Sequence, residues 1–466
     1  MRSWLFVVTV TCFLAGCQAE RTLLKPSLAE KGEIFLYLRP FPREAEGLKF
    51  SLAQVSAVKD DGSEYPLALS ITDFSRGAIK RQRFLATGEL PPGNYVALSM
   101  NVTGATLLDE EGEQRLLVPE KPVQIECRFS VTNEKAYFLS LAFRYDQSVR
   151  EGFGFTPVFS VTQPGKPVTG LIGYVTNYGS NILTVFDKQY YEVVGVIATG
   201  SGPMGMAFDQ QRRRAYVSLA GEDMVEVFDI VTGDVINRIR LKLGDAPREL
   251  ALSSDGRLLL TVNPGSNTVS VVDPLAYIET NRILVGNKPT SILIDPSGVR
   301  AYVFNSLSQS ISVIDIASRS IVATVTNEPV LSRGQFNRSG DILYTIQDLS
   351  SYIRLVNPFS LALIQRYRVG LGMSTIKVDT LNNLIYTGRS HSGDVEVYEP
   401  TTFMPISTIP TDGASSYMTI DNELNNLYVI NGDKKRVEVI NLVTREIVAE
   451  FDVGEGPFWL SLMGER

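Results

Sequence analysis

The side chains that could do chemistry in this chain are a small set of arginines, aromatic rings, one carboxylate and one imidazole. They are Glu249, Arg333, Arg389, His391, Tyr417 and Trp459. Guanidinium forks bind carboxylates and phosphates through paired hydrogen bonds, and aromatic faces suit sugar-sized groups. If the fold brings these side chains together, they form a recognition patch for an anion or a sugar. The alternative is that they are ordinary rim residues around a water-filled opening.

Other chemistry is limited by what the chain lacks. His391 is the only histidine, so a Ser-His-Asp triad is possible only if His391 serves in it. Its neighbours Ser390, Ser392 and Gly393 favour a solvated loop histidine. The three cysteines form no Cys-x-x-Cys pair. We therefore predict no catalytic residue, no metal site and no cofactor.

A repeat of 42 or 44 residues must position the candidate residues. Its apolar anchors are Tyr174, Tyr216, Leu260, Tyr302, Tyr344, Tyr386 and Tyr428. Thirteen residues after each anchor comes an acidic or amide side chain: Asp187, Asp229, Asp273, Asp315, Asn357, Glu399 and Asn441. A period of this length indicates a propeller, and each unit reads as four short strands. We expect the recurring polar side chain to hydrogen-bond the backbone of the turn that follows it.

The repeat predicts where the candidates lie. Eleven residues before each anchor is a position at the central opening, which includes Glu249, Arg333, Tyr417 and, through the last strand, Trp459. The loops between second and third strands contribute Arg389 and His391 on the same face. Gly456–Leu462 matches the inner-strand segments, so we expect the C-terminal strand to complete the first blade and hide the last edge. The fold class is all-β, with seven blades in residues 171–466.

These residues resemble the YVTN-type seven-bladed propellers of bacterial surface and periplasmic proteins. Tyr174-Val175-Thr176-Asn177 matches the motif that names the family, and 302–305 and 260–263 are close variants. The fifth and sixth units depart most, since Gln347 and Arg389 replace the asparagine. Relaxed blades are the ones free to acquire a partner, although drift explains the departure equally well.

The N-terminal residues have the pattern of a targeting signal. Arg2 and the apolar run Trp4–Ala15 have the layout of a secretory signal, and the run is too short to span a bilayer. Leu14-Ala15-Gly16-Cys17 resembles the lipobox of bacterial lipoproteins. That resemblance implies a signal peptide over 1–16 and acylation of Cys17, for example with palmitate, as a membrane anchor. Gln18 favours the outer membrane. Residues 17–31 read as a lipidated tether that holds the body off the lipid surface.

Between the tether and the repeats, residues 32–163 alternate apolar and polar side chains in about eight short runs. This spacing predicts an antiparallel β-sandwich. Leu90-Pro91-Pro92-Gly93-Asn94-Tyr95 is similar to the strand-entry turn of Ig-like and transthyretin-like modules. Residues 164–170, rich in proline and glycine, read as a short stiff linker.

Three functions remain open. The first is a lipid-anchored envelope protein whose propeller binds an envelope protein or a small polar ligand without catalysis. The second is a lactonase-like hydrolase or lyase, because such propellers place acidic, arginine and histidine residues at the mouth. The third is single-stranded DNA binding, as is thought of some family members. From residue 168 onward 25 basic residues face 32 acidic ones, so a nucleic-acid partner is not expected.

Overall fold

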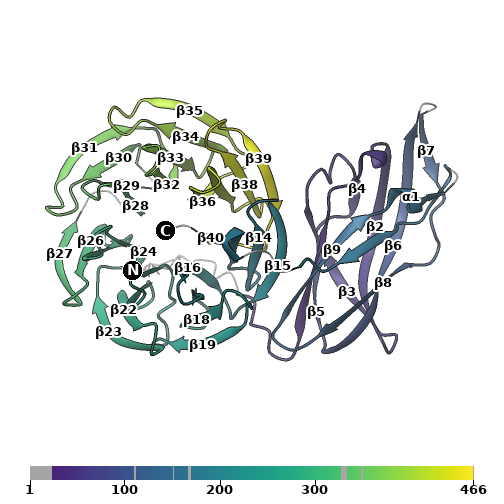
Figure 1. Cartoon of the computed structure of the whole chain (residues 1–466), viewed down its shortest axis with the longest axis horizontal. Helices are drawn as coiled ribbons and strands as arrows, with labels where there is room; N and C mark the ends of the chain where they lie inside the picture. The colour runs from purple at the N-terminus through teal and green to yellow at the C-terminus, as the bar shows by residue number, and fades with distance from the viewer. Residues whose placement is uncertain are drawn as a thin grey trace, which may run out of the picture.

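The computed structural model describes residues 24–109, 112–150, 152–165, 169–326, 333–347 and 350–464. An N-terminal curled β-sheet lies beside a seven-bladed propeller (Figure 1). The all-β class, the seven blades and their closure by the C-terminal strand are confirmed. None of the helices in the described residues is long and apolar enough to cross a membrane.

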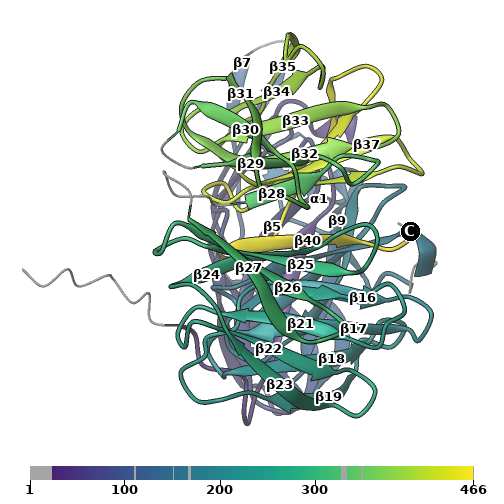
Figure 2. The same ribbon diagram turned by 90° about the vertical axis from the view of Figure 1, so that its left-hand side faces the viewer.

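The propeller is built from seven four-stranded antiparallel sheets. In the side view, β40, which is the inner strand of blade 1, runs through the middle of the ring (Figure 2). Blade 1 contains β40 (Pro457–Leu462), β13 (Ile172–Asn177), β14 (Ile182–Asp187) and β15 (Glu192–Ala198). Blade 2 contains β16 (Pro203–Asp209), β17 (Arg214–Leu219), β18 (Met224–Asp229) and β19 (Val235–Arg240). Blade 3 contains β20 (Leu250–Leu252), β21 (Leu259–Asn263), β22 (Thr268–Asp273) and β23 (Ile278–Leu284).

The other four blades follow the same order from the inner strand outward. Blade 4 contains β24 (Pro289–Ile294), β25 (Arg300–Asn305), β26 (Ser310–Asp315) and β27 (Ser320–Thr326). Blade 5 contains β28 (Arg333–Phe336), β29 (Leu343–Ile346), β30 (Tyr352–Val356) and β31 (Leu363–Arg368). Blade 6 contains β32 (Met373–Asp379), β33 (Leu384–Arg389), β34 (Asp394–Tyr398) and β35 (Pro405–Pro410). Blade 7 contains β36 (Ser415–Asp421), β37 (Asn426–Asn431), β38 (Arg436–Asn441) and β39 (Ile447–Asp452).

The recurring side chains build the blades as predicted. The acidic or amide residue at the end of each third strand accepts hydrogen bonds from the next turn, as Asp229 does from Val231 N at 2.8 Å and Thr232 N at 2.9 Å. The anchor tyrosines of blades 1, 2 and 4 each donate to a backbone carbonyl of the next blade; the Tyr174 hydroxyl, for example, donates to Ile230 O at 3.0 Å. The motif asparagine ties the second strand to the third, since Asn177 Nδ2 donates to Thr184 Oγ1 at 2.9 Å. The repeat is therefore a structural device.

The ring closes through blade 1. β40 pairs antiparallel with β13, with Trp459 opposite Thr176. On the face opposite the motif asparagines, Lys188 Nζ lies 2.8 Å from Asp421 Oδ2, and both side chains are fully buried. The same ammonium donates to Met463 O at 2.8 Å. Blades 1 and 7 and the C-terminal residues are thus joined by an ion pair as well as by strand pairing.

The N-terminal sheet differs from the predicted antiparallel sandwich. Its ten strands form one mixed sheet, in which β1 runs parallel to β9 and a short β3–β5 pairing joins the two halves. The strands are β1 (Gly32–Leu38), β2 (Leu48–Lys59), β3 (Glu64–Leu69), β4 (Asp73–Ser75), β5 (Arg83–Leu90), β6 (Gly93–Asp109), β7 (Gly112–Leu116), β8 (Val123–Val131), β9 (Ala136–Phe143) and β12 (Phe159–Thr162). The sheet curls around its own apolar core, so a single sheet encloses the core that two sheets enclose in a sandwich.

Short elements complete this region. They are η1 (Arg43–Ala45), α1 (Tyr145–Ser148), the hairpin of β10 (Val149–Arg150) and β11 (Gly154–Phe155), and η2 (Thr169–Leu171), which leads into the propeller. Cys127 is free and buried, and burial raises the pKa of its thiol to about 11. Of the predicted linker 164–170, residues 166–168 lie outside the described residues.

The curled sheet packs on blades 1 and 7 through a shared core. The side chains of Phe35 and Tyr37 point away from the core of their own sheet and pack with Val175, Phe186 and Phe451 of the propeller. At the edge of this contact, buried Gln82 makes two hydrogen bonds to the backbone of β15: Gln82 Nε2 donates to Val193 O at 2.9 Å, and Val193 N donates to Gln82 Oε1 at 2.7 Å. The apolar contact and the paired backbone bonds fix the sheet to the propeller.

The first described residues also contact the propeller. Asn181 Nδ2 donates to Lys25 O at 2.6 Å, and Ser201 Oγ donates to the same carbonyl at 2.8 Å. Lys25 Nζ lies 2.7 Å from Glu33 Oε2 in β1. The predicted tether 17–31 is therefore docked from residue 24 onward, because its backbone is hydrogen-bonded to the loops of blades 1 and 2. Residues 17–23, with Cys17, lie outside the described residues.

Candidate functional site

Four of the six predicted site residues meet at the central opening. Glu249 lies immediately before β20, the inner strand of blade 3, whereas Arg333, Tyr417 and Trp459 lie in the inner strands of blades 5, 7 and 1. Arg333 Nη2 lies 2.7 Å from Glu249 Oε1. The same guanidinium carbon lies 5.2 Å from the Tyr417 ring centroid and 5.8 Å from that of Trp459. We call these four residues the mouth cluster.

The inner strands explain this meeting. Each inner strand follows the loop that joins its blade to the preceding one. The position eleven residues before the anchor lies at or near the start of that strand; Arg333, for example, pairs with Ile346 at the end of β29. Seven equivalent positions therefore surround one axis near one face of the ring. We call that face, formed by the second-to-third strand loops and the loops between blades, the loop face.

The charged side chains of the mouth cluster are largely buried, and its two aromatic rings are half-buried. The Glu249 side chain is 3% exposed and that of Arg333 17% exposed. The rings of Tyr417 and Trp459 are 4.4 Å apart between centroids, and Trp459 Nε1 donates to Ser461 Oγ at 3.0 Å. A guanidinium held over two aromatic faces gains cation–π attraction, which is stronger where water is excluded. The cluster therefore presents a fixed cation beside aromatic surface.

A second arginine–aromatic contact lies next to the mouth cluster in the chain. Arg248 stands 5.1 Å from the Phe458 ring centroid, measured from its guanidinium carbon. The phenol of Tyr178 is half-buried; burial raises its pKa, and the nearby Arg248 charge lowers it in part. The prediction missed Arg248 and Phe458, although each precedes a predicted residue by one position. The signal that identifies them is the repeat position twelve residues before the anchor, one before the position used for the prediction.

Arg389 is not part of the mouth cluster. Its guanidinium donates to Val369 O at 2.6 Å, to Leu371 O, and to Glu396 Oε2 at 2.6 Å. These bonds tie β33 to the loop between blades 5 and 6. The bond of Arg389 to Glu396 in β34 also links the second strand to the third, as the motif asparagine does in blade 1.

His391 lies on the same loop face but on an exposed loop after β33. Its Nδ1 is 2.6 Å from the hydroxyl of Ser390, its neighbour in the chain. Among the residues that the structure describes, no three histidine, cysteine, aspartate or glutamate side chains converge on a possible metal position.

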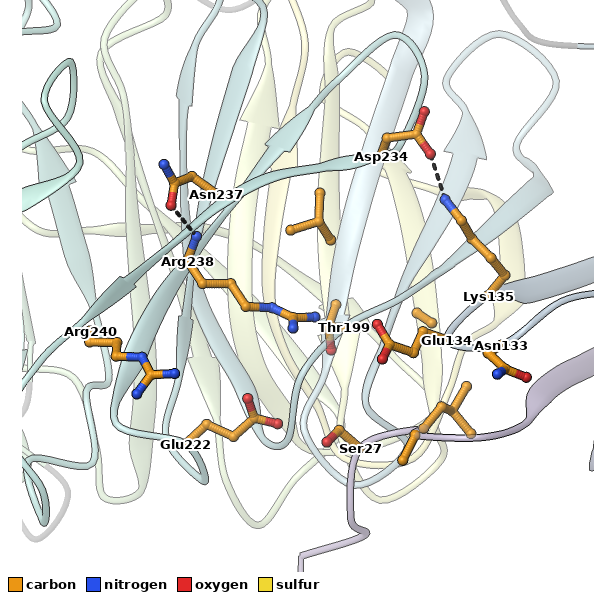
Figure 3. Close-up of a pocket in the computed structure, with 14 residues that line it drawn as sticks. Ser27, Asn133, Glu134, Lys135, Thr199, Glu222, Asp234, Asn237, Arg238 and Arg240 are labelled. Atoms are coloured by element: carbon orange, nitrogen blue, oxygen red, sulfur yellow. Dashed lines mark hydrogen bonds and ion pairs between the residues drawn. The ribbon is translucent and has the colours of Figure 1, made fainter.

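A separate cleft of about 660 Å³ opens between the propeller and the curled sheet (Figure 3). Its walls come from the docked N-terminal segment, the β8–β9 turn, the end of β15 and the outer strand of blade 2. Lys135 Nζ lies 2.5 Å from Asp234 Oδ1 across it, and Arg238 Nε lies 2.8 Å from buried Glu226. Burial raises the pKa of Glu226, and the Arg238 charge offsets part of that rise. Of the six charged side chains that line this cleft, Lys135, Asp234 and Arg238 already take part in ion pairs.

No protein-family model matches the chain, and no curated protein is similar to it in sequence. Many solved structures match the chain. One is hydrazine synthase of Kuenenia stuttgartiensis, at 20% identity and a TM-score of 0.49, covering 55% of this chain and 87% of that one. Another is the dihydro-heme d1 dehydrogenase NirN in complex with DHE, at 18% identity and a TM-score of 0.50, covering 62% and 65%.

A third is a functionally unknown protein from Desulfotomaculum acetoxidans, at 11% identity and a TM-score of 0.56, covering 63% of this chain and 99% of that one. At these identities the likeness to the second and third structures, with TM-scores of 0.50 and 0.56, shows the propeller fold alone.

Proposed function

We propose that this chain is a lipid-anchored bacterial envelope protein whose propeller binds a partner at the mouth cluster without catalysing a reaction. The observation that carries the proposal is the arrangement of Arg333 between the Glu249 carboxylate and the rings of Tyr417 and Trp459. Other inner strands carry small or unrelated side chains at this position, such as Gly205, Ser291 and Thr375. The cluster is thus not required by the repeat.

The chemistry of the cluster points to a ligand with an anionic or sugar-like group. A guanidinium has five donors in a planar fork, and one of those of Arg333 goes to Glu249. An incoming carboxylate or phosphate would compete with Glu249 for the fork, whereas a sugar would stack on the aromatic faces and accept from the fork. Neither binding of an anion nor binding of a sugar in these ways requires a proton-transfer step. An envelope protein that inserts an acidic or glycosylated loop presents the same groups.

The anchor half of the proposal rests on the sequence. Leu14-Ala15-Gly16-Cys17 supports acylation of Cys17, and several acyl chains give firm membrane attachment where one is marginal. Gln18 supports an outer-membrane location, facing the periplasm or the exterior. The acidic excess of the repeat region disfavours a nucleic-acid partner.

The binding half is tested by crosslinking in the intact envelope. The lipidated chain is crosslinked and purified beside Arg333→Ala and Trp459→Ala variants. The matched control is Arg300→Ala, because Arg300 makes a cation–π contact with Phe359, 5.9 Å to the ring centroid, on the opposite face. We expect one crosslinked partner to be lost in both mouth variants and kept in the control. Capture of the same partner by all four proteins would contradict the proposal.

The hydrolase alternative has its own readout in the same preparations. Hydrolysis of lactones or glycosides that disappears in Glu249→Gln or His391→Ala would replace the binding proposal with an enzymatic one. Glu249→Gln keeps the shape of the side chain, so a loss of activity there would report on its charge.

A further inference from the structure

The docked N-terminal segment fixes where a membrane anchor leaves the molecule. Lys25 O accepts hydrogen bonds from Asn181 in the β13–β14 loop and from Ser201 in the loop before β16. Pro26 O accepts a further one from Asn181 Nδ2 at 3.2 Å. Both loops belong to the loop face. The chain therefore enters the described structure on the face at which the mouth cluster stands.

Asn181 is adapted to this contact. Its Oδ1 accepts from Gly202 N at 2.9 Å, which secures the loop between blades 1 and 2. The equivalent residues Asp223 and Asn267 do the same for their own blades, accepting from Ala246 N and Lys288 N. Unlike the acceptor-only carboxylate of Asp223, the amide of Asn181 can also donate to a carbonyl, and in blade 1 its nitrogen donates to the N-terminal segment. The docking thus uses a donor that the propeller does not need for itself.

Chain length then limits the position of Cys17. Leu24 stands seven residues after Cys17. Seven fully extended residues span at most about 25 Å. An acylated Cys17 would therefore lie within that distance of the loop face, near blades 1 and 2, and the bilayer that holds it would lie on the same side.

We propose that the loop face of the propeller lies against the lipid bilayer in which the chain is anchored. This inference rests on the proposed acylation of Cys17. Apolar side chains at loop tips fit such a contact: Leu243 is 97% exposed, Leu307 70% and Leu371 67%. Leucines at the level of the lipid headgroups gain from burying their side chains in the acyl boundary. The mouth cluster then faces ligands at or in the membrane surface.

Exposed apolar residues alone do not choose between the two faces. The opposite face carries Phe359 at 63% and Val443 at 77% exposure, both in turns between third and fourth strands. A membrane contact through that face would require the segment before Leu24 to pass around the edge of the ring. The docking of Lys25 and the seven-residue limit decide for the loop face.

The test compares the depth of the two faces in vesicles. The full lipidated chain, carrying Leu307→Cys or Phe359→Cys with an environment-sensitive fluorophore, is reconstituted in phosphatidylethanolamine and phosphatidylglycerol vesicles that contain a spin-labelled quenching lipid. Cys127 is buried with a raised thiol pKa, so it competes little for the label. We expect several-fold stronger quenching at 307 than at 359.

Equal or stronger quenching at 359, or no quenching at either position, would overturn the inference. The mass of the same protein separates the two levels of failure. Acyl chains on Cys17 with quenching at 359 leave the anchor standing and refute the orientation, whereas an unmodified Cys17 removes the anchor and the orientation together. In the Asn181→Asp variant, which keeps the Gly202 contact and loses the donor to Lys25, the difference between 307 and 359 should shrink.

Discussion

Lys188 and Asp421 form a fully buried ion pair, 2.8 Å between Nζ and Oδ2, that joins the first and last blades of the ring. Asp421 Oδ1 also accepts from Glu423 N at 3.0 Å, so its carboxylate is held by its own turn. Strand pairing through β40 closes the ring on one side of blade 1, and this ion pair closes it at the turns. In each contact, the two partners are separated in the sequence by more than half of the length of the propeller.

Breaking this ion pair should destabilise the protein strongly. We expect Lys188→Met to cost about 3–5 kcal/mol of unfolding free energy, because it leaves the Asp421 charge buried without a partner. The double variant Lys188→Met with Asp421→Leu should recover much of that loss, since no buried charge remains. Urea denaturation followed by circular dichroism measures both. Equal losses in the single and double variants would show that packing, not the charge, is what the closure needs.

The amide of Asn181 should be necessary for docking of the N-terminal segment. Asn181→Asp removes the donor to Lys25 O and Pro26 O while keeping the acceptor for Gly202 N. We expect faster amide hydrogen exchange in residues 24–31, by the factor of about ten that corresponds to roughly 1.4 kcal/mol. Asn267→Asp is the matched control, because Asn267 secures its own loop in the same way. Unchanged exchange in the Asn181 variant would mean that other contacts hold the segment.

Arg389 should behave as a structural residue. Arg389→Ala removes donors to Val369 O and Leu371 O and the partner of Glu396, and hydrogen bonds to charged groups are worth about 1.5–3 kcal/mol each. Amides of residues 369–372 should therefore exchange faster, with capture of the envelope partner intact. Loss of capture without a change in exchange would return Arg389 to the binding site.

Asp245 should make stability depend on acid pH. Its buried carboxylate accepts hydrogen bonds from Nη1 and Nη2 of Arg282, each at 2.7 Å. Burial raises the pKa of Asp245, but the bonds from Arg282, Ser266 and Lys242 outweigh it and the net pKa is lowered. A lowered folded pKa stabilises the protein above the unfolded value, about 3.9, and this contribution is lost as the pH falls through the folded pKa. The stability gap between wild type and Asp245→Asn should therefore be full at pH 6 and narrow below pH about 3.9; a constant gap would contradict this.

The propeller could be predicted because every blade repeats one solution. The side chain thirteen residues after each anchor accepts a hydrogen bond from the following turn in all seven blades, and every anchor side chain is buried, so their spacing indicates the fold directly. Four site residues were predictable for the same reason, because equivalent positions on inner strands must surround the axis. Arg389 was misplaced because its position in the motif directs the side chain toward the neighbouring strand and loop, which spacing alone does not show.

The N-terminal sheet was harder to predict because its defining contacts are distant in the sequence. β5 lacks a clean alternation of apolar and polar side chains, yet it lies between β1 and β3. The apolar run Ile34–Leu38 indicated a strand but not its surroundings. Ile34 and Leu36 face the core of the sheet, while Phe35 and Tyr37 face the propeller. A strand covered on both faces reads as an unbroken apolar run, and nothing in that run names the second partner.

The proposed location and the proposed orientation both depend on acylation of Cys17, and the N-terminus of the mature protein tests that acylation directly. The full chain is expressed in a bacterial envelope, extracted with detergent and digested, and its first peptide is measured by mass spectrometry. We predict that the mature chain begins at Cys17 and carries the mass of several acyl chains, and that Cys17→Ser abolishes both the cleavage and the added mass. A mature chain that begins elsewhere, or begins at Cys17 without acyl mass, would contradict the account.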